Sequence, residues 1–225
     1  MNSCIIPARG GSEGIKKKNL YPLLGKPLIQ WTIEQALRSK VDNVFVSTDD
    51  NEIKNISLEL GAEIIQRPNE LSDSVSSSES ALKHAIKEIT IVKEKKPSLI
   101  TFLQATSPLR LPHDINNAID QFYQSSSDSL FSSSVLEDLT LWHKQDGSWA
   151  SINFDYKNRG RRQELNKNYV ENGSIYLFKP EILESFNNRL GGDIDSYIME
   201  SWQYHEIDIV SDIQVVEFFM EKNIL

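Results

Sequence analysis

The sequence predicts an α/β fold built on a doubly wound, mostly parallel sheet. Short segments rich in β-branched residues alternate along most of the chain with amphipathic segments of helical spacing. This alternation is typical of parallel strands joined by helical crossovers. A chain of 225 residues is long enough to give one such domain a substantial core, so we expect a single domain over residues 1–225.

The first half of the chain carries the clearest alternation. Pro27 suits the first turn of a helix, and apolar residues from Ile29 to Ala36 repeat at helical spacing after it. Gly61 is placed to end a second helix, and a serine-rich stretch over 72–80 precedes a third. We expect strands before Pro7 and over 44–48, 63–68 and 99–103, and helices over 28–40, 52–60, from the serines to Lys95, and over 112–124.

The pattern changes between residues 137 and 168. Four aromatic residues lie there among polar ones, in short alternating runs with Asp146 and Gly147 as a hairpin turn. The segment is too short for its own core, so we interpret it as a small β-rich arm. Exposed aromatic side chains favour a partner surface, most simply a second copy of the chain, which predicts a homodimer. After the arm we expect strands over 175–179 and 204–209 and a closing helix over 212–220.

Composition excludes several classes of protein. The formal net charge of −8 argues against a nucleic-acid surface, where a basic face is expected. No apolar run approaches the ~20 residues that span a bilayer, and the start of the chain does not have the pattern of a signal peptide. The single cysteine, Cys4, excludes an internal disulfide and is expected in the core of the first strand. We therefore expect a cytoplasmic protein without a nucleic-acid or membrane partner.

The stretch from Ile5 to Asn19 is the strongest candidate for a binding site. A short apolar run leads into a turn with glycines at 10, 11 and 14, followed by three lysines. Glycines let consecutive backbone N–H groups turn toward one anion, and Arg9 and a lysine of 16–18 can add charge-assisted hydrogen bonds to phosphate. The alternative is a β-turn with a solvated basic run. The spacing matches neither the P-loop nor the dinucleotide-binding glycine motif.

Three predicted loops meet at one edge of the expected sheet. Ligands of doubly wound sheets bind beyond the carboxyl ends of the strands, where the loops 7–19, 48–50 and 104–110 are expected. Because the protein is acidic overall, an anionic ligand requires a local cationic pocket. The cations available for this pocket are residues 16–18, Lys26, Arg67, Arg110 and residues 159–162.

Seven motifs follow one another along nearly the whole chain. They are IIPARGGSEGIKKKN, STDD, RPNELSDS, FLQATSPLR, RRQEL, ENGSIYLF and HEIDIVSD. Together they resemble the acylneuraminate cytidylyltransferases, the CMP-sialic acid synthetases. The resemblance implies transfer of CMP from CTP to the anomeric hydroxyl of a nine-carbon 2-keto sugar acid, with release of pyrophosphate and with Mg²⁺ as cofactor. It also implies a Rossmann-like sheet of the nucleotide-diphospho-sugar transferase type and a dimer formed through the inserted arm.

The resemblance places the nucleotide on the glycine-rich stretch and on the segments that follow it. Arg9 and Lys18 stand at catalytic positions, where fixed cations stabilise the charge that moves onto the leaving pyrophosphate. Arg67 and Ser78 fall on the cytosine side, with Ser76 and Ser77 as alternatives to Ser78, which is itself open to interpretation as a helix cap. The implied nucleotide-binding residues are Ala8, Gly10, Gly11, Ser12, Asn19, Arg67 and Ser78.

The resemblance assigns the acceptor acid to a second group of residues. Gln104 matches a glutamine whose amide can bond sugar hydroxyls in either sense. Arg162 offers a planar guanidinium to the carboxylate of the acid, and the alternative for it is surface charge on the arm. The implied sugar-binding residues are Gln104, Arg162, Gln163, Asn172 and Tyr176. Val170 and Glu171 stand where the family often has a basic residue, so the identity of the acceptor stays open.

Glu206 and Asp208 match a pair of aspartates in the family. On a strand, residues two apart point to the same face, so both carboxylates can reach one site. Mg²⁺ prefers one or two carboxylates together with phosphate oxygens and water, which makes Asp208 and Glu206 the predicted metal ligands and Asp208 a catalytic residue as well. Glu206 is one methylene longer than aspartate, so contact through water stays open for it. Asp212 is assigned to the cap of the last helix.

Two other functions remain open at this point. The first is a cytidylyltransferase for another ulosonic acid, either the eight-carbon acid Kdo or a relative of sialic acid such as legionaminic or pseudaminic acid. Kdo enzymes lack the RRQ and NGSIY segments in this form. The second is a non-catalytic nucleotide-sugar sensor that has kept the fold, against which the intact Arg9, Lys18 and Asp208 argue.

Overall fold

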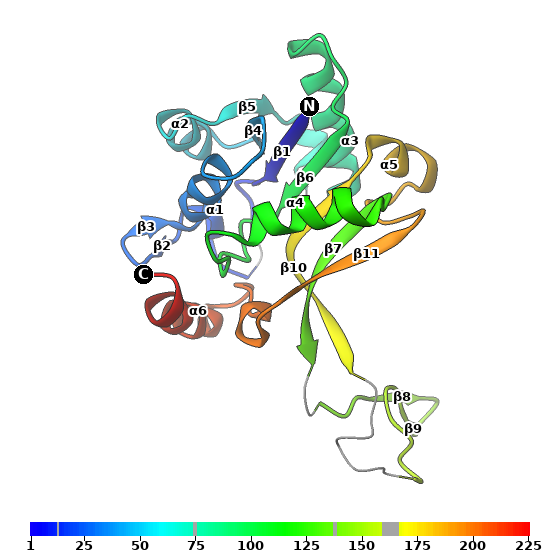
Figure 1. Ribbon diagram of the computed structural model, residues 1–225. Coiled ribbons are helices and arrows are strands. Elements are labelled where there is room, and N and C mark those ends of the chain that lie inside the picture. The colour runs from blue at the N-terminus through cyan, green and yellow to red at the C-terminus, as the bar shows by residue number, and fades with distance from the viewer. Residues whose placement is uncertain (13, 74–75, 137–138, 159–166) are drawn as a thin grey trace.

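A seven-stranded, mostly parallel sheet forms the centre of the protein, which confirms the predicted fold class (Figure 1). The structure, a computed structural model, describes all residues except 13, 74–75, 137–138 and 159–166. β10 runs antiparallel to both of its neighbours, β6 and β7, and every other neighbouring pair in this sheet is parallel. In the order β11-β7-β10-β6-β1-β4-β5, the strands are Ile194–Met199, Ser129–Leu136, Asn168–Phe178, Leu99–Leu103, Asn2–Pro7, Asn43–Thr48 and Glu63–Gln66.

Helices cover both faces of the sheet and enclose two apolar clusters. Ile33 of α1 and Phe122 of α4 pack against one face, and Leu82 of α3 and Leu183 of α5 pack against the other. Cys4 of β1 is completely buried in the first cluster, as predicted. The helices are α1 (Leu28–Leu37), α2 (Asn51–Glu59), α3 (Ser78–Val92), α4 (Asp114–Ser125), α5 (Pro180–Phe186) and α6 (Val210–Asn223).

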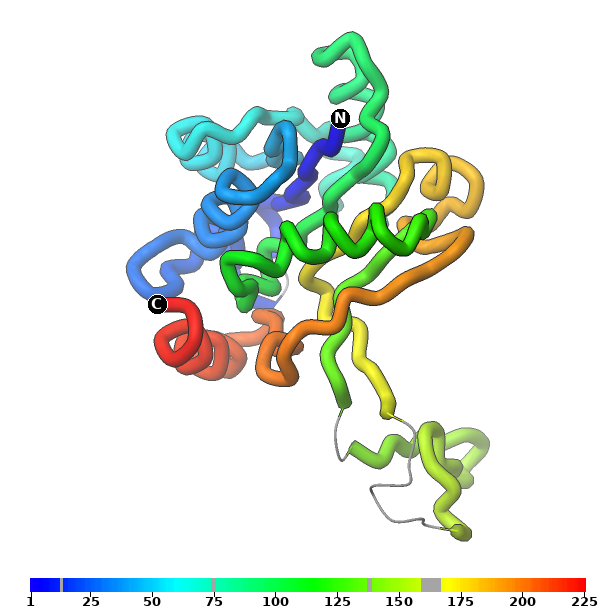
Figure 2. Tube along the Cα trace, in the orientation of Figure 1, coloured from blue at the N-terminus to red at the C-terminus, as the bar shows by residue number. Residues whose placement is uncertain are grey.

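The end of the chain returns to its beginning. Val216 and Met220 of α6 pack with Leu23 and Trp31 in a third apolar cluster, next to the short strands β2 (Pro22–Leu23) and β3 (Lys26–Pro27). Figure 2 shows the C-terminal segment beside this early part of the chain. The packing brings the residues just before α6 to the carboxyl edge of the sheet, where the glycine-rich stretch lies.

The prediction of a strand over residues 204–209 is wrong. Residues 201–204 form a 3₁₀ turn, and residues 205–209 form a loop. Ile207 is buried in the third cluster, and its amide donates to the carbonyl oxygen of Thr106 (2.8 Å). The alternation of apolar and polar residues in this segment thus reflects a single isoleucine that anchors a loop, and not a strand. The edge strand β11 was not predicted from the sequence. Its polar residues Asp195 and Ser196 interrupt the apolar pattern that would indicate a strand.

The inserted segment projects beyond the carboxyl edge of the sheet. β8 (Trp142–Gln145) and β9 (Ser148–Ser151) form the predicted hairpin, with Asp146 and Gly147 in its turn at positive φ. The hairpin lies at the far end of the ribbon formed by β7 and β10, away from the other helices and strands (Figure 1). Within the described part of the chain, no helix has both the length and the apolar character needed to cross a membrane.

Candidate active site

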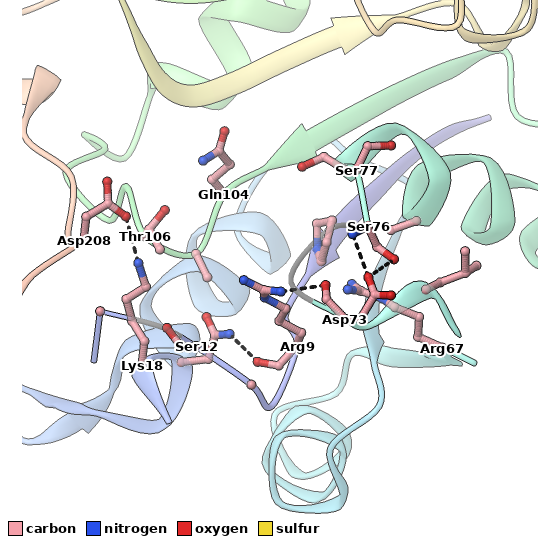
Figure 3. A pocket seen from close by; sticks show the side chains of 18 of the residues that line it. Arg9, Ser12, Lys18, Arg67, Asp73, Ser76, Ser77, Gln104, Thr106 and Asp208 are labelled. Atoms are coloured by element: carbon pink, nitrogen blue, oxygen red, sulfur yellow. Dashed lines mark hydrogen bonds and ion pairs between the residues drawn. The ribbon is translucent and has the colours of Figure 1, made fainter. Parts of the chain in front are cut away.

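A cavity of about 500 Å³ opens at the carboxyl edge of the sheet. Its walls come from the segment after β1, the end of β6, the start of α3 and the loop before α6 (Figure 3). Ligands of doubly wound sheets bind at this edge. The predicted site residues that line it are Arg9, Gly11, Ser12, Lys18, Asn19, Arg67, Ser78, Gln104 and Asp208.

Hydrogen bonds from two different parts of the chain hold the glycine-rich segment in place. Asn19 Nδ2 donates to the carbonyl oxygen of Arg9 (3.0 Å), and the Gly10 amide donates to Asp49 Oδ1 (3.0 Å). Asp49 therefore fixes the backbone of this segment. The loop 48–50 itself does not line the cavity. Ala8 is buried, and its amide donates to the carbonyl oxygen of Ser47. Of the predicted phosphate-side backbone, Gly11 and Ser12 face the cavity, and Ala8 and Gly10 lie behind it.

The glycine-rich segment contributes two cations, Arg9 and Lys18, to the cavity. Arg9 Nη1 donates to the carbonyl oxygen of Asp73 (2.7 Å), and Lys18 Nζ donates to the Ile207 carbonyl (2.9 Å) and to Asp208 Oδ1 (2.8 Å) (Figure 3). Lys17 instead pairs with Glu52 on the surface (2.6 Å), as expected for a solvated lysine. Arg9 and Lys18 are thus fixed from both sides of the cavity.

Two of the predicted cations have other roles. Arg110 is almost completely buried and donates to the carbonyl oxygens of Gln104 (2.7 Å) and Ser174 (2.8 Å). Its burial lowers the pKa of the guanidinium to about 10. Lys26 pairs with Glu34 of α1 (2.8 Å). The expectation that Lys26 and Arg110 belong to the cationic pocket is wrong; Arg110 instead ties the end of β6 to β10.

Arg67 and three serines form the opposite wall. Arg67 is buried and donates through Nε and Nη2 to the hydroxyl (3.1 Å) and the carbonyl (2.6 Å) of Ser47. Burial lowers the pKa of its guanidinium, and Asp49 acts in the opposite direction. Ser76 bonds Asp73, and Ser77 is the cap of α3, so Ser78 is the serine whose hydroxyl is not used by the described residues.

A second group of polar residues gathers around Gly173, which has a φ of +64°. A Cβ on Gly173 would lie 3.1 Å from Glu206 Oε2, 3.4 Å from Ser107 Oγ and 3.5 Å from Gln104 Nε2, so these groups surround one point. The glycine sits where the pairing of β10 with β7 changes register, between Glu171 and Tyr176. The positive φ favours glycine at this position, and a Cβ would press most closely on the Glu206 carboxylate.

The remaining sugar-side predictions do not reach the cavity or lie outside the described residues. Asn172 is buried, and its amide is used by Ser132, Ser134 and Met199. Tyr176 stacks on Phe102 (ring centroids 5.2 Å apart), and its hydroxyl donates to Glu171. Burial, followed by the hydrogen bond to Glu171, raises the pKa of the Tyr176 phenol. Arg162 and Gln163 belong to the residues that the structure does not describe.

Glu206 and Asp208 lie together although their segment is a loop. Asp208 lines the cavity, whereas Glu206 is half-buried next to it, near Ser107. Burial raises the pKa of Glu206, and the neighbouring Asp208 carboxylate raises it further. Asp212, in the first turn of α6, accepts from the amides of Asp208 (2.8 Å) and Ile209 (2.9 Å), so its side chain caps the start of the helix while Ile209 holds the N-cap position. Among the described residues, no group of three or more His, Cys, Asp or Glu is placed to hold a metal.

Sequence reasoning missed several residues of the site. Asp73 and Thr106 line the cavity, and Asp49 supports the glycine-rich segment. Gly14 packs so closely on the Asp208 carbonyl that any Cβ there would collide with it. The motifs STDD and QATS contained Asp49 and Thr106, but local sequence does not show that residue 14 meets residue 208.

The sheet and the cavity at its carboxyl edge define an α/β protein of the doubly wound class. The sequence model of the cytidylyltransferases matches residues 3–200. N-acylneuraminate cytidylyltransferase B of Danio rerio is 35% identical over 96% of this chain and 50% of its own length. A pseudaminic acid cytidylyltransferase of Campylobacter jejuni is 37% identical over 78% of this chain and 77% of its own.

The chain therefore belongs to the cytidylyltransferase family, in the group that contains the acylneuraminate and pseudaminic acid enzymes. It spans about half the length of the Danio rerio relatives. A solved structure of a CMP:2-keto-3-deoxy-manno-octonic acid synthetase complexed with CTP has the same fold, with a TM-score of 0.73, 17% identity and 99% of each chain covered.

Proposed function

We propose that the protein transfers CMP from CTP to the anomeric hydroxyl of a nine-carbon 2-keto sugar acid and releases pyrophosphate. The observation that carries this proposal is one cavity lined by Arg9, Lys18, Arg67 and Asp208 in a member of the cytidylyltransferase family. The cations suit a triphosphate, and the acidic residue suits the divalent ion that accompanies it. The relatives are named for N-acylneuraminate and pseudaminic acid, and these names support a nine-carbon sugar acid as the acceptor.

The nucleotide occupies the part of the cavity between the glycine-rich segment and the start of α3. Arg9 and Lys18 bind the phosphates and stabilise the negative charge that moves onto the leaving pyrophosphate. Gly11 and Ser12 line the same wall. Arg67 and Ser78 contact the cytosine edge, which offers acceptors at O2 and N3 and a donor at N4.

The acceptor acid occupies the side next to Gln104 and Gly173. The Gln104 amide, held through its backbone by Arg110, binds hydroxyl groups of the sugar. The anomeric oxygen attacks the α-phosphorus in line, the bond to the β-phosphate breaks, and pyrophosphate leaves with the electron pair. The anomeric hydroxyl passes its proton to solvent water in this step. None of the described residues is required as a covalent nucleophile.

Mg²⁺ fits the residues present. Asp208, whose side chain is 64% exposed, lies at the cavity rim, and its carboxylate is close enough to raise the pKa of Glu206. One or two carboxylates, completed by phosphate oxygens and water, are the ligands that Mg²⁺ prefers. Asp208 would hold the ion, with Glu206 beside it. When bound, the ion would neutralise phosphate charge during transfer.

We further propose that the arm over residues 137–168 mediates a homodimer. Trp149, Ile152 and Tyr156 are exposed on it, with exposed fractions of 64%, 58% and 47%. Apolar patches of this kind, far from the core, are typical of interaction surfaces. The free, buried Cys4 fits the reducing cytoplasm, which we propose as the compartment.

The test is a pyrophosphate-release assay with purified protein, CTP, Mg²⁺ and one acid at a time. The panel comprises N-acetylneuraminic, legionaminic and pseudaminic acid and Kdo, and mass spectrometry identifies each CMP product. We expect equimolar pyrophosphate and CMP-sugar with at least one nine-carbon acid. Turnover of Kdo alone would favour the alternative ulosonic acid. Binding of CTP without turnover of any acid would favour the non-catalytic sensor.

A further inference from the structure

Arg189, in the segment between α5 and β11, contacts three other elements of the fold. Its Nε and Nη2 approach Oε1 of Glu79 on α3 at 3.0 and 2.8 Å. The same guanidinium lies over the rings of Phe102 on β6 (4.9 Å) and Tyr176 on β10 (4.7 Å). Both partners of the ion pair are well shielded, with side-chain exposures of 19% and 18%. One side chain thus joins a helix to two strands.

These contacts hold two walls of the cavity together. Glu79 lies in the first turn of α3 and directly follows Ser77 and Ser78, which line the cavity. Phe102 lines it from β6, and Gln104 lies two residues further along. The Arg189 guanidinium therefore ties the serine wall to the wall formed by Phe102 and Gln104.

The chemistry of the contact requires an arginine. The guanidinium directs two donors at one carboxylate while its flat face covers the rings, which a lysine ammonium cannot do at once. Tyr176 is immobilised from the other side, because its hydroxyl donates to Glu171. Phe102 is thus stacked on a fixed ring and covered by a fixed cation.

We propose that Arg189 is a positioning residue for the acceptor side of the cavity. It keeps Phe102, and with it the neighbouring Gln104, at a set distance from the start of α3. This inference rests on the proposed function, which assigns the Gln104 side to the sugar acid. Arg189 does not touch either substrate in this scheme, and acts through Phe102.

The test compares Arg189→Leu, Arg189→Lys and Glu79→Gln in steady-state kinetics with both substrates. We expect Arg189→Leu to raise the KM for the acid about 3- to 10-fold, since it removes a cation from two rings. The KM for CTP should rise clearly less than the KM for the acid, because Ser78 stays on the intact helix α3 whereas Phe102 loses the cation that covers it, and kcat should stay within about twofold. Arg189→Lys, which retains the charge, should recover part of the loss.

Lys83→Gln is the matched control. Lys83 Nζ donates to Asn187 Oδ1 (2.6 Å), so it also links α3 to the segment that carries Arg189, but it does not touch Phe102 or Tyr176. We expect its kinetics to match the wild type. Equal rises in both KM values for Arg189→Leu, or the same change in Lys83→Gln, would overturn the inference.

A measurement independent of turnover separates this inference from the proposed function. Hydrogen exchange of the unliganded protein should show faster exchange at Ser78–Ala81 and Phe102–Gln104 in Arg189→Leu than in Lys83→Gln. If the wild type turns over none of the acids, the proposed function fails, and with it the acceptor assignment of Arg189. Unchanged exchange in Arg189→Leu would refute the contact itself, even in an active enzyme.

Discussion

The two halves of the cavity are built in different ways. The half that we assign to the nucleotide contains residues that follow parallel strands, such as Arg9 after β1 and Arg67 after β5. The half that we assign to the acceptor combines Gln104, which directly follows β6, with two irregular segments: the register change at Gly173 in β10 and the loop around Glu206. Parallel strands therefore position residues of both halves, but the second half also depends on tertiary contacts between irregular segments.

Among the described residues, two contacts join the halves at Asp208, in addition to the contacts of Arg189. Lys18 pairs with Asp208, and Gly14 packs against the backbone of the same residue. Changes at these contacts should affect both halves, whereas changes to residues that line only one half should affect that half alone.

The largest effect is expected for Asp208→Asn, which removes the carboxylate shared by the two halves. Pyrophosphate release should fall about 100- to 1,000-fold, in the range seen when one electrostatic stabiliser of a transition state is removed. The pair with Lys18 is exposed on the aspartate side and contributes about 0–1 kcal/mol to stability, so the thermal midpoint should change little.

Asp120→Asn is the control for this change. It breaks an exposed pair with Lys40 (2.6 Å) of the same chemistry, away from the cavity, and should leave activity unaltered. Wild-type rates of Asp208→Asn at saturating Mg²⁺ would show that the metal assignment is wrong.

A smaller effect is expected for Gly14→Ala. The new Cβ would collide with the Asp208 carbonyl, so the glycine-rich segment and the loop before α6 must move apart. Displacement of catalytic groups by about 1 Å can cost on the order of 100-fold, and we expect a 10- to 100-fold loss of kcat/KM. Gly11→Ala, which meets nothing within 4 Å, should lose clearly less. Equal losses in the two variants would mean that contact with Asp208 does not matter.

The smallest effect is expected for Arg67→Lys, which affects the nucleotide half alone. A lysine cannot reproduce the two bonds that Arg67 donates to Ser47, so the cytosine side loses a fixed donor. Hydrogen bonds to charged groups are worth roughly 1.5–3 kcal/mol, and we expect the KM for CTP to rise about tenfold with the KM for the acid unchanged. Calorimetric titration with CTP should show a parallel rise in the Kd for CTP. Arg38→Lys, at an exposed pair on α1, should change neither KM.

The same comparison explains what the sequence could predict. Arg9 and Lys18 belong to one continuous segment after a strand, so the strand pattern placed that segment correctly at the sheet edge, whereas only the family resemblance selected Lys18 from residues 16–18. The expected strand over 204–209 was wrong because the alternating pattern came from Ile207, a single anchor in an apolar cluster. Even so, Glu206 and Asp208 come together in the loop that Ile207 holds.

The direction of the side chains in β10 could not be predicted from the sequence. The motif ENGSIY predicted sugar contacts for Asn172 and Tyr176, but the first bonds core serines and the second stacks on Phe102. The register shifts between Glu171 and Tyr176, and this shift depends on the pairing of β10 with β7, which local sequence does not show. Arg189 likewise contacts elements more than eighty residues away in the chain, namely α3 and β6.

The reversed direction of β10 has a consequence for how such a protein can diversify. β7 ends and β10 begins at the same edge of the sheet as the cavity, and the chain between them can lengthen without disturbing the seven-stranded sheet. Insertions at this point would extend the projecting arm, while the strands that carry the cavity stay unchanged. A lineage could therefore change the surface that the arm presents and leave the cavity intact.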